Sequence, residues 1–169
     1  KKDAEATVRE LMETDDGYDA AVWSQMAEQL GLQSMIIPEE YGGQGFGYVE
    51  LGIALEEMGR SLLCEPFFST VVLAGNAIIH SGNEDAKAAL LPGIADGSTI
   101  ATMALAEASG RWDAEGITVE ASGTGDEATI TGEKMFVTDG GTANLFVVAA
   151  RAEGGIHLYT VYGDATGLS

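Results

Sequence analysis

The sequence predicts an α+β protein, with an all-helical bundle domain over residues 1–97 followed by an antiparallel β domain over residues 98–169. Two observations support this division. Before residue 98, apolar side chains recur every three or four residues, which is the period of an amphipathic helix. After it, short segments rich in Thr, Val and Ile alternate with Gly and Asp turns, which is typical of antiparallel strands.

The helices of the first domain follow from their apolar spacing and end signals. Asp19 is expected to cap a helix that Gly31 ends, with an apolar stripe formed by Trp23, Met26, Ala27 and Leu30. After the loop at residues 42–47, a second stripe is formed by Leu51, Ala54, Leu55, Met58 and Leu62. Residues 67–79 are apolar on nearly every face, which predicts a helix buried between others. Asn83 should cap a further helix, which Pro92-Gly93 interrupts and residues 95–97 end.

The β domain is expected to contain short strands separated by glycine-rich turns. The candidate strands are residues 99–106, 116–121, 128–131, 134–138, 144–150 and 156–162. The turns between them are residues 122–126 and 139–141, where Gly and Asp gather.

The charge balance restricts the partners of the protein. The chain has 27 Asp and Glu against 8 Lys and Arg, a net charge of −19. Such a surface repels nucleic acid and anionic membranes, so neither is an expected partner. Cys64 is the single cysteine, which excludes an internal disulfide, and no signal peptide follows Lys1-Lys2. A cytoplasmic location is therefore expected.

Residues 42–47, Gly-Gly-Gln-Gly-Phe-Gly, partly match a dinucleotide-binding pattern. Gly43 and Gly45 fit its first two glycines, but Tyr48 stands where the third belongs, and no parallel βαβ unit is predicted. We interpret the segment as a tight turn that leads into the next helix. His80 and His157 do not combine with Cys64 or carboxylates at ligand spacing, so no metal site is predicted.

Five segments, in order along the chain, resemble motifs of the acyl-CoA dehydrogenase family. Three lie in the predicted helical domain: Leu30-Gly31 with Pro38-Glu39-Glu40-Tyr41-Gly42-Gly43, then Glu56-Glu57-Met58-Gly59-Arg60, then Lys87 with Leu91-Pro92-Gly93. Two lie in the β domain: Met103-Ala104-Leu105-Ala106-Glu107 and Gly132-Glu133-Lys134-Met135-Phe136-Val137-Thr138-Asp139-Gly140. Together they extend from about Asp19 to the end of the sequence.

The resemblance implies a function as well as a fold. In this family FAD lies against a barrel-like β domain, and subunits pair as homo- or hetero-oligomers. The reaction converts an acyl-CoA to a trans-2-enoyl-CoA, and an electron-transfer flavoprotein accepts the electrons. The catalytic base belongs to a C-terminal four-helix domain that is absent from this sequence, so no catalytic residue is assigned.

The resemblance also implies which residues face the flavin. By position, these are the backbone of Met103, Leu105 and Ala106, and of Phe136 and Val137, with the Thr138 hydroxyl reaching the ring. Rigid backbone groups and a hydroxyl suit the polar rim of an isoalloxazine. Arg111 and Trp112 are the predicted substrate-binding residues.

The sequence departs from the family pattern near this wall. Ala106 replaces a common Thr, Ala108 replaces Pro, and Ser109-Gly110-Arg111-Trp112-Asp113 replaces G-A-G-S-D. Similar departures occur in actinobacterial relatives that act on steroid side-chain CoA esters as mixed tetramers. Two alternatives therefore stand beside a working dehydrogenase: a non-catalytic or half-site subunit of a hetero-oligomer, and a flavin oxidase or monooxygenase relative.

Overall fold

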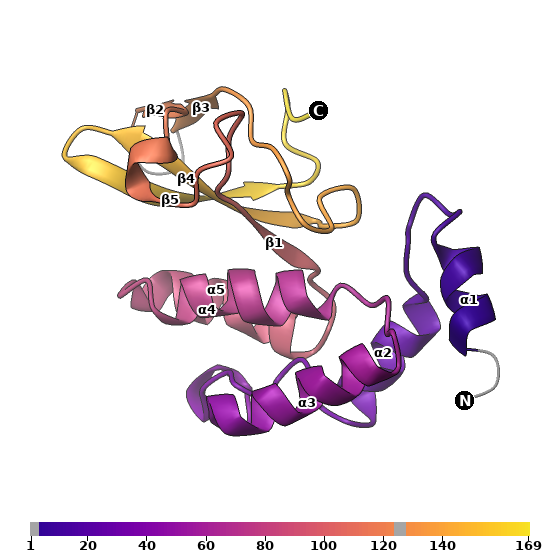
Figure 1. Ribbon diagram of the computed structural model, residues 1–169. Helices are drawn as coiled ribbons and strands as arrows, with labels where there is room; N and C mark the ends of the chain where they lie inside the picture. The colour runs from indigo at the N-terminus through magenta and orange to yellow at the C-terminus, as the bar shows by residue number, and fades with distance from the viewer. Residues whose placement is uncertain (1–3, 124–127) are drawn as a thin grey trace.

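The computed structural model describes residues 4–123 and 128–169, as helices below a curved sheet (Figure 1). The helices are α1 (Ala4–Leu11), α2 (Ala20–Glu28), the 3-10 turn η1 (Glu39–Tyr41), α3 (Tyr48–Arg60), the π-helix η2 (Phe68–Gly75), α4 (Asn76–Ile79), α5 (Glu84–Ala95) and the 3-10 turn η3 (Ala114–Gly116). The strands are β1 (Ala101–Ala104), β2 (Glu120–Ser122), β3 (Thr129–Thr131), β4 (Leu145–Ala152) and β5 (Gly155–Tyr162). The predicted α+β class is confirmed.

Two predicted helix caps are confirmed. The Asp19 carboxylate accepts hydrogen bonds from the backbone N–H groups of Ala21 (2.9 Å) and Val22 (3.3 Å) at the start of α2. The Asn83 side chain accepts one from Ala86 N–H (3.0 Å) at the start of α5. Each cap satisfies a backbone donor that the first turn of a helix leaves without a partner.

Three details of the predicted helices are wrong. Leu30 lies beyond the end of α2 and is exposed, although Trp23 and Met26 of its stripe are buried. Leu62 is exposed beyond the end of α3. The helix α5 is not interrupted at Pro92-Gly93, because a proline on the exposed side removes only one backbone donor, and Asp96 N–H still donates to the Pro92 carbonyl (3.0 Å). Its end at Ala95 is as predicted.

The apolar segment at residues 67–79 is helical and largely buried, as its composition predicts. Its first part is the π-helix η2, and its last turn is α4. The side chains of Phe67, Val71 and Ala74 are buried, whereas Phe68 is half exposed. The Thr70 hydroxyl oxygen accepts a hydrogen bond from Ala101 N–H (3.1 Å), which fixes η2 against the first strand.

The sheet is mixed, which corrects the prediction of purely antiparallel strands. The strand β5 pairs antiparallel with β4 along its whole length, and β3 pairs antiparallel with β2. However, β1 runs parallel to β4 from the pair Ala101–Leu145 onward, and β2 runs parallel to β4 at Glu120–Arg151. The continuous apolar run in β4 is typical of a strand covered on both faces, and it does not distinguish the two directions of pairing.

Residues 134–138 form no strand, so that prediction is wrong. Phe136 and Asp139 have φ angles of 55° and 54°, and a left-handed residue cannot continue an extended run. The predicted turn at residues 122–126 lies in part outside the described residues.

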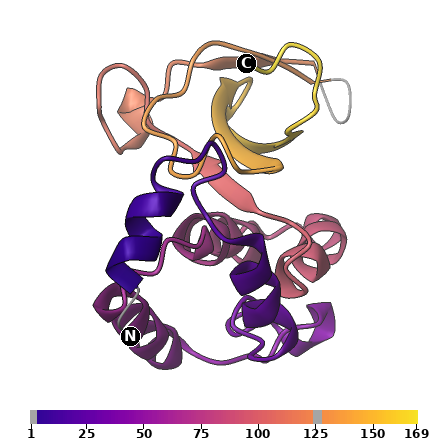
Figure 2. The same cartoon turned by 90° about the vertical axis from the view of Figure 1, so that its right-hand side faces the viewer.

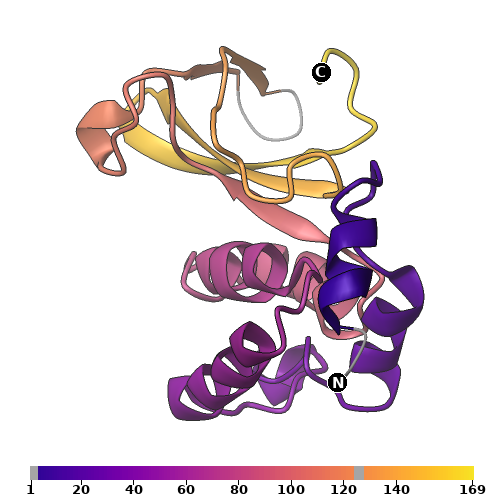
Figure 3. The ribbon, with the colours of Figure 1, turned by 45° about the vertical axis from the view of Figure 1, so that its right-hand side comes forward.

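The apolar core joins the helices to the sheet. Leu91 and Ile94 of α5 belong to one buried cluster with Leu145 and Val147 of β4. Figures 2 and 3 show α4 and α5 next to the sheet, with α3 farther from it. Because the two parts share this core, the division at residues 97 and 98 stays a prediction about domains. No described helix is long and apolar enough to cross a membrane.

Candidate functional site

Two segments that the sequence places 30 residues apart meet beside β1. The backbone N–H of Met135 donates to the Ala106 carbonyl (2.8 Å). The buried Thr102 hydroxyl donates to the Thr138 carbonyl (2.6 Å). These two hydrogen bonds hold the turn at residues 135–139 against the end of β1, so the two segments expected to face a flavin lie side by side.

The members of this predicted wall differ in exposure. Ala106 is buried, and Met103 and Leu105 are partly buried. Phe136 is 71 % exposed and Thr138 is also exposed. The buried Ala106 can offer at most its backbone atoms to a ligand. The Phe136 ring and the Thr138 side chain are exposed and can contact one.

The turn contains backbone donors that the described residues do not pair. Within the described residues, the backbone N–H groups of Phe136, Val137 and Thr138 make no hydrogen bond. The left-handed conformation of Phe136 is unfavourable by about 1–2 kcal/mol for a residue with a side chain. Backbone strain of this kind gathers at ligand sites. Free donors and a hydroxyl on a strained turn fit the acceptor atoms at the rim of an isoalloxazine ring.

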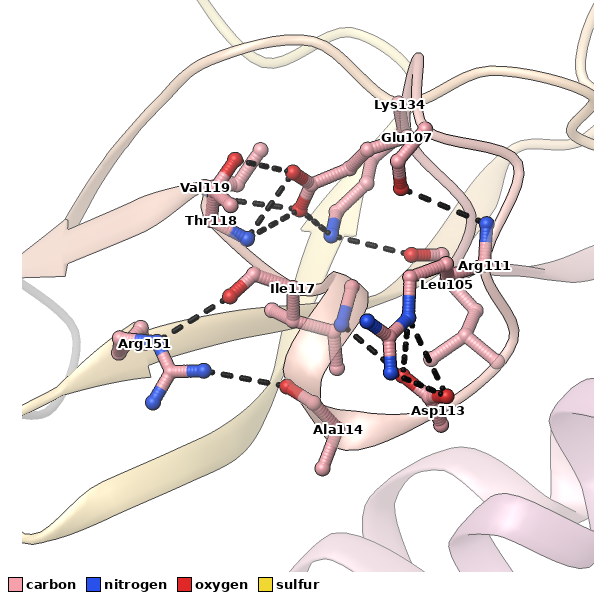
Figure 4. Close-up of polar contacts among 12 residues, drawn as sticks. Leu105, Glu107, Arg111, Asp113, Ala114, Ile117, Thr118, Val119, Lys134 and Arg151 are labelled. Atoms are coloured by element: carbon pink, nitrogen blue, oxygen red, sulfur yellow. Dashed lines mark hydrogen bonds and ion pairs between the residues drawn. The ribbon is translucent and has the colours of Figure 1, made fainter.

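A buried ion pair joins the two segments of the predicted wall, next to Ala106 and Met135 (Figure 4). The Lys134 Nζ lies 2.7 Å from Glu107 Oε1, and the side chains are only 9 % and 8 % exposed. Lys134 also donates to the Leu105 carbonyl (3.2 Å). Glu107 accepts from the backbone N–H groups of Thr118 (2.9 Å) and Val119 (3.0 Å), and from the Thr118 hydroxyl. One carboxylate therefore connects the end of β1, the segment before β2 and Lys134, which precedes the turn at residues 135–139.

The environment keeps Glu107 ionised. Burial alone would raise the pKa of its carboxyl, but the hydrogen bonds from Lys134, Thr118 and Val119 outweigh burial and lower the pKa to about 2. At neutral pH the side chain is a fixed anion whose lone pairs are used. Its arrangement suits positioning rather than proton transfer.

The predicted substrate residues Arg111 and Trp112 lie on an exposed loop. The Arg111 guanidinium forms ion pairs with Asp113 (2.8 Å) and Glu115 (2.6 Å) of the same loop. Trp112 is 68 % exposed. Arg151 of β4 donates to the carbonyls of Ile117 and Ala114 (both 3.1 Å), which ties the loop to the sheet (Figure 4). Among the described residues, the contacts of the Arg111 guanidinium are with Asp113 and Glu115 and not with the predicted wall.

Sequence reasoning gave no role to Thr102, Glu107 or Lys134. A signal for the last two was present, because Glu107 directly follows the apolar residues 103–106 and Lys134 directly precedes the apolar residues 135–137. Charged side chains in such segments are buried in pairs. No group of three or more His, Cys, Asp or Glu in the described residues could hold a metal ion.

Comparisons with known proteins agree with the motifs. Residues 1–98 match the family model "Acyl-CoA dehydrogenase, N-terminal domain". Acyl-CoA dehydrogenase FadE12 of Mycobacterium tuberculosis is 34 % identical over 161 residues, which is 90 % of this chain and 41 % of FadE12. The probable acyl-CoA dehydrogenase YngJ of Bacillus subtilis is 32 % identical over 124 residues, 72 % of this chain and 33 % of YngJ. The chain thus spans less than half the length of these relatives.

Solved structures show the same likeness. The ChsE4-ChsE5 complex of M. tuberculosis contains a chain with a TM-score of 0.84 and 29 % identity, covering 98 % of this chain and 44 % of that one. The Tcur3481-Tcur3483 steroid ACAD gives a TM-score of 0.85 and 32 % identity, covering 99 % and 46 %. A glutaryl-CoA dehydrogenase of Mycobacterium smegmatis, in complex with FADH2, gives 0.78 and 26 %, covering 99 % and 46 %. The matched domain, the relatives and the shared fold together establish that the chain belongs to the acyl-CoA dehydrogenase family.

Proposed function

We propose that this chain supplies the helical region and the flavin-facing wall of an FAD-dependent acyl-CoA dehydrogenase, which oxidises an acyl-CoA to a trans-2-enoyl-CoA. The observation that carries the proposal is the strained turn at Phe136, Val137 and Thr138, whose free N–H groups lie beside the end of β1. Met103, Leu105 and Ala106 complete the proposed wall. Bound FAD would accept the hydride from the β carbon of the substrate.

The residues of the wall have distinct proposed tasks. The N–H groups of Phe136 and Val137 and the Thr138 hydroxyl donate to the polar rim of the ring, while the exposed Phe136 ring covers its apolar part. The Leu105, Ala106 and Thr138 carbonyls each accept an internal hydrogen bond, so they fix the position of the wall. Because the wall is held in place, the N–H groups and the hydroxyl can bind a cofactor without reorganisation.

The experiment measures FAD affinity by the quenching of flavin fluorescence, in the native-length protein expressed with any natural partner. Thr138→Val removes the proposed hydroxyl contact and should weaken FAD binding by roughly tenfold. Thr131→Val, at an exposed threonine of β3, is the matched control and should leave affinity unchanged. The native-length protein should be yellow and should bleach when acyl-CoA is added. A correctly folded wild type that stays colourless would refute the proposal.

A specific observation favours a second candidate, a half-site or non-catalytic subunit in a hetero-oligomer. Ala106 offers no hydroxyl, and the Arg111 guanidinium is already engaged by Asp113 and Glu115. The similar ChsE4-ChsE5 structure is a complex of two different chains. Co-purification with an unlike subunit, and activity only in the mixture, would support this candidate. Activity of the protein as a homo-oligomer would exclude it.

The substrate and electron acceptor follow from the same proposal. We expect Trp112, which is exposed, to contact a bulky acyl group, and a steroid side-chain CoA ester is the class to test first because one similar solved structure is a steroid ACAD. An electron-transfer flavoprotein is the expected acceptor, in the cytoplasm. Trp112→Ala should raise the KM for a bulky acyl-CoA more than the KM for butyryl-CoA. Oxygen consumption without any other acceptor would instead indicate an oxidase.

A further inference from the structure

A small cavity lies in the helical region, away from the proposed flavin wall. It is about 160 Å³ in volume and lies between α1, the start of α2 and residues 61–65. Figure 3 shows α1 and α2 on the same side of the helical region. Its lining residues are Thr7, Val8, Leu11, Asp19, Val22, Ser61, Leu62, Leu63, Cys64 and Glu65. None of them is among the residues proposed to contact FAD or the acyl-CoA.

Glu65 is the unusual member of this lining. It is only 9 % exposed, and its Oε1 accepts one long hydrogen bond from Asp19 N–H (3.4 Å). Its Oε2 is fully buried and has no hydrogen-bond partner within the described residues. A buried polar atom without a partner costs about 1–3 kcal/mol, so a native structure normally provides one. The orphaned oxygen therefore points to a donor that the described residues do not supply.

The remaining groups around Glu65 favour a cationic donor. Asp19 at the start of α2 adds a second carboxylate to the lining. Burial raises the pKa of the neighbouring Tyr18 hydroxyl, and the charges of Asp16 and then Glu65 raise it further. The helix α1 contributes the uncharged residues Thr7, Val8 and Leu11 to the lining. Residues 61–65 contribute one titratable group besides Glu65, which is the Cys64 thiol. Within the described residues, no Lys, Arg or His lines the cavity.

The apolar walls set the size of the ligand. Val8 and Leu11 face the cavity from α1, Val22 from α2, and Leu62 and Leu63 from the connecting segment. A cavity of about 150 Å³ lined by apolar side chains accommodates benzene. The space thus suits an apolar body of about six carbons with a single polar head.

We propose that this cavity binds a small amphipathic primary amine, with its ammonium group on the Glu65 carboxylate and its apolar body against Val8, Leu11 and Val22. An ammonium supplies the donor that Glu65 Oε2 lacks, and its positive charge offsets the negative charges of Glu65 and Asp19. A neutral alcohol of the same shape would fill the space but would leave this charge uncompensated. The ligand would also link α1 to α2, because residues of both helices line the cavity.

The pH dependence of binding follows from Glu65. Burial raises the pKa of its carboxyl to about 7, the hydrogen bond from Asp19 N–H lowers it and the Asp19 charge raises it further. The anionic form that binds an ammonium therefore predominates only above that value. Amine binding should be tighter at pH 8 than at pH 6.

The test uses benzylamine and its neutral counterpart benzyl alcohol as probes, with affinity measured by calorimetry on the full chain. At pH 8 benzylamine should bind roughly tenfold tighter than benzyl alcohol, because a charged hydrogen bond is added. Glu65→Gln keeps the shape of the side chain and should abolish this preference. Val8→Phe should fill the cavity and weaken both probes, without any change at Glu65.

Glu57→Gln, at an exposed glutamate of α3, is the matched control and should keep the wild-type preference. Equal affinities for the two probes, or a preference that survives in Glu65→Gln, would overturn the proposal. An absence of saturable benzylamine binding to the wild type would do the same, because the cavity would then hold water alone.

Discussion

The buried pair of Glu107 and Lys134 gives the sharpest prediction about stability. Lys134→Met keeps the length of the side chain but removes the ammonium 2.7 Å from the carboxylate. Removing one partner of a buried pair costs about 3–5 kcal/mol, because the other charge stays behind without compensation. The donors from Thr118 and Val119 remain, so we expect the lower end, about 3 kcal/mol. For a chain of this size, that lowers Tm by roughly 6–12 °C.

Urea denaturation monitored by tryptophan fluorescence measures this loss directly. The control is Arg60→Met, since Arg60 pairs with Glu56 at 2.9 Å with both side chains mostly exposed (63 % and 70 %). An exposed pair of this kind contributes less than about 1 kcal/mol. If Lys134→Met destabilised the chain no more than Arg60→Met, the Glu107 site would not be a buried, tightly connected pair, and the reasoning would fail.

Acid adds an independent check on the same pair. The pKa of Glu107 is lowered to about 2 in the folded state, below the value of about 4.3 for a free glutamate. Its contribution to stability is therefore complete above pH 4.3 and is lost as the pH falls toward 2. In Lys134→Met the folded pKa rises, so this acid-dependent loss of stability should become smaller.

Four further substitutions have defined expected outcomes. The raised pKa of Glu65 makes wild-type stability fall as the pH rises from about 4.3 through 7, and Glu65→Gln should flatten that slope in urea titrations at pH 5 and 8. Gly43→Ala should lower the unfolding free energy measured in urea by about 1–3 kcal/mol, because a Cβ there would lie 1.8 Å from the Ile37 carbonyl oxygen. Gly59→Ala in α3 is the control: its Cβ would meet open space, so it should raise the unfolding free energy by about 0.5–1 kcal/mol. Trp23→Phe should lower the unfolding free energy by about 1 kcal/mol beyond the loss of volume, since Gly97 O loses its donor at 2.8 Å.

Local signals in the sequence predicted local structure well. Asp19 and Asn83 cap their helices because a short polar side chain before an apolar stripe has a direct local task. The glycine-rich loop at residues 42–47 leads into α3, in agreement with its interpretation as a tight turn before the next helix. These features depend on a few neighbouring residues, which the sequence displays.

Features that depend on distant partners could not be predicted. The direction in which β1 pairs with β4 is decided by a connection of some 40 residues, which leaves no mark on the apolar pattern of β4. The segment at residues 134–138 has the composition of a strand, but hydrogen bonds from Met135 to Ala106 and from Thr102 to Thr138 hold it as a turn. The unpaired Oε2 of Glu65 lies at a cavity lined by α1 and the start of α2, which are distant from Glu65 in the sequence.

The shared core has a consequence for the order in which the protein acquires its structure. Leu91 and Ile94 of α5 are covered by Leu145 and Val147, which are synthesised some 50 residues later. The Thr142 hydroxyl likewise closes onto the Asp16 carbonyl, across 126 residues. During translation the helices leave the ribosome while the apolar face of α5 is still exposed to water. An unfinished chain with exposed apolar surface is prone to aggregate. Safe synthesis of the helical region therefore depends on how soon β4 follows it out of the ribosome.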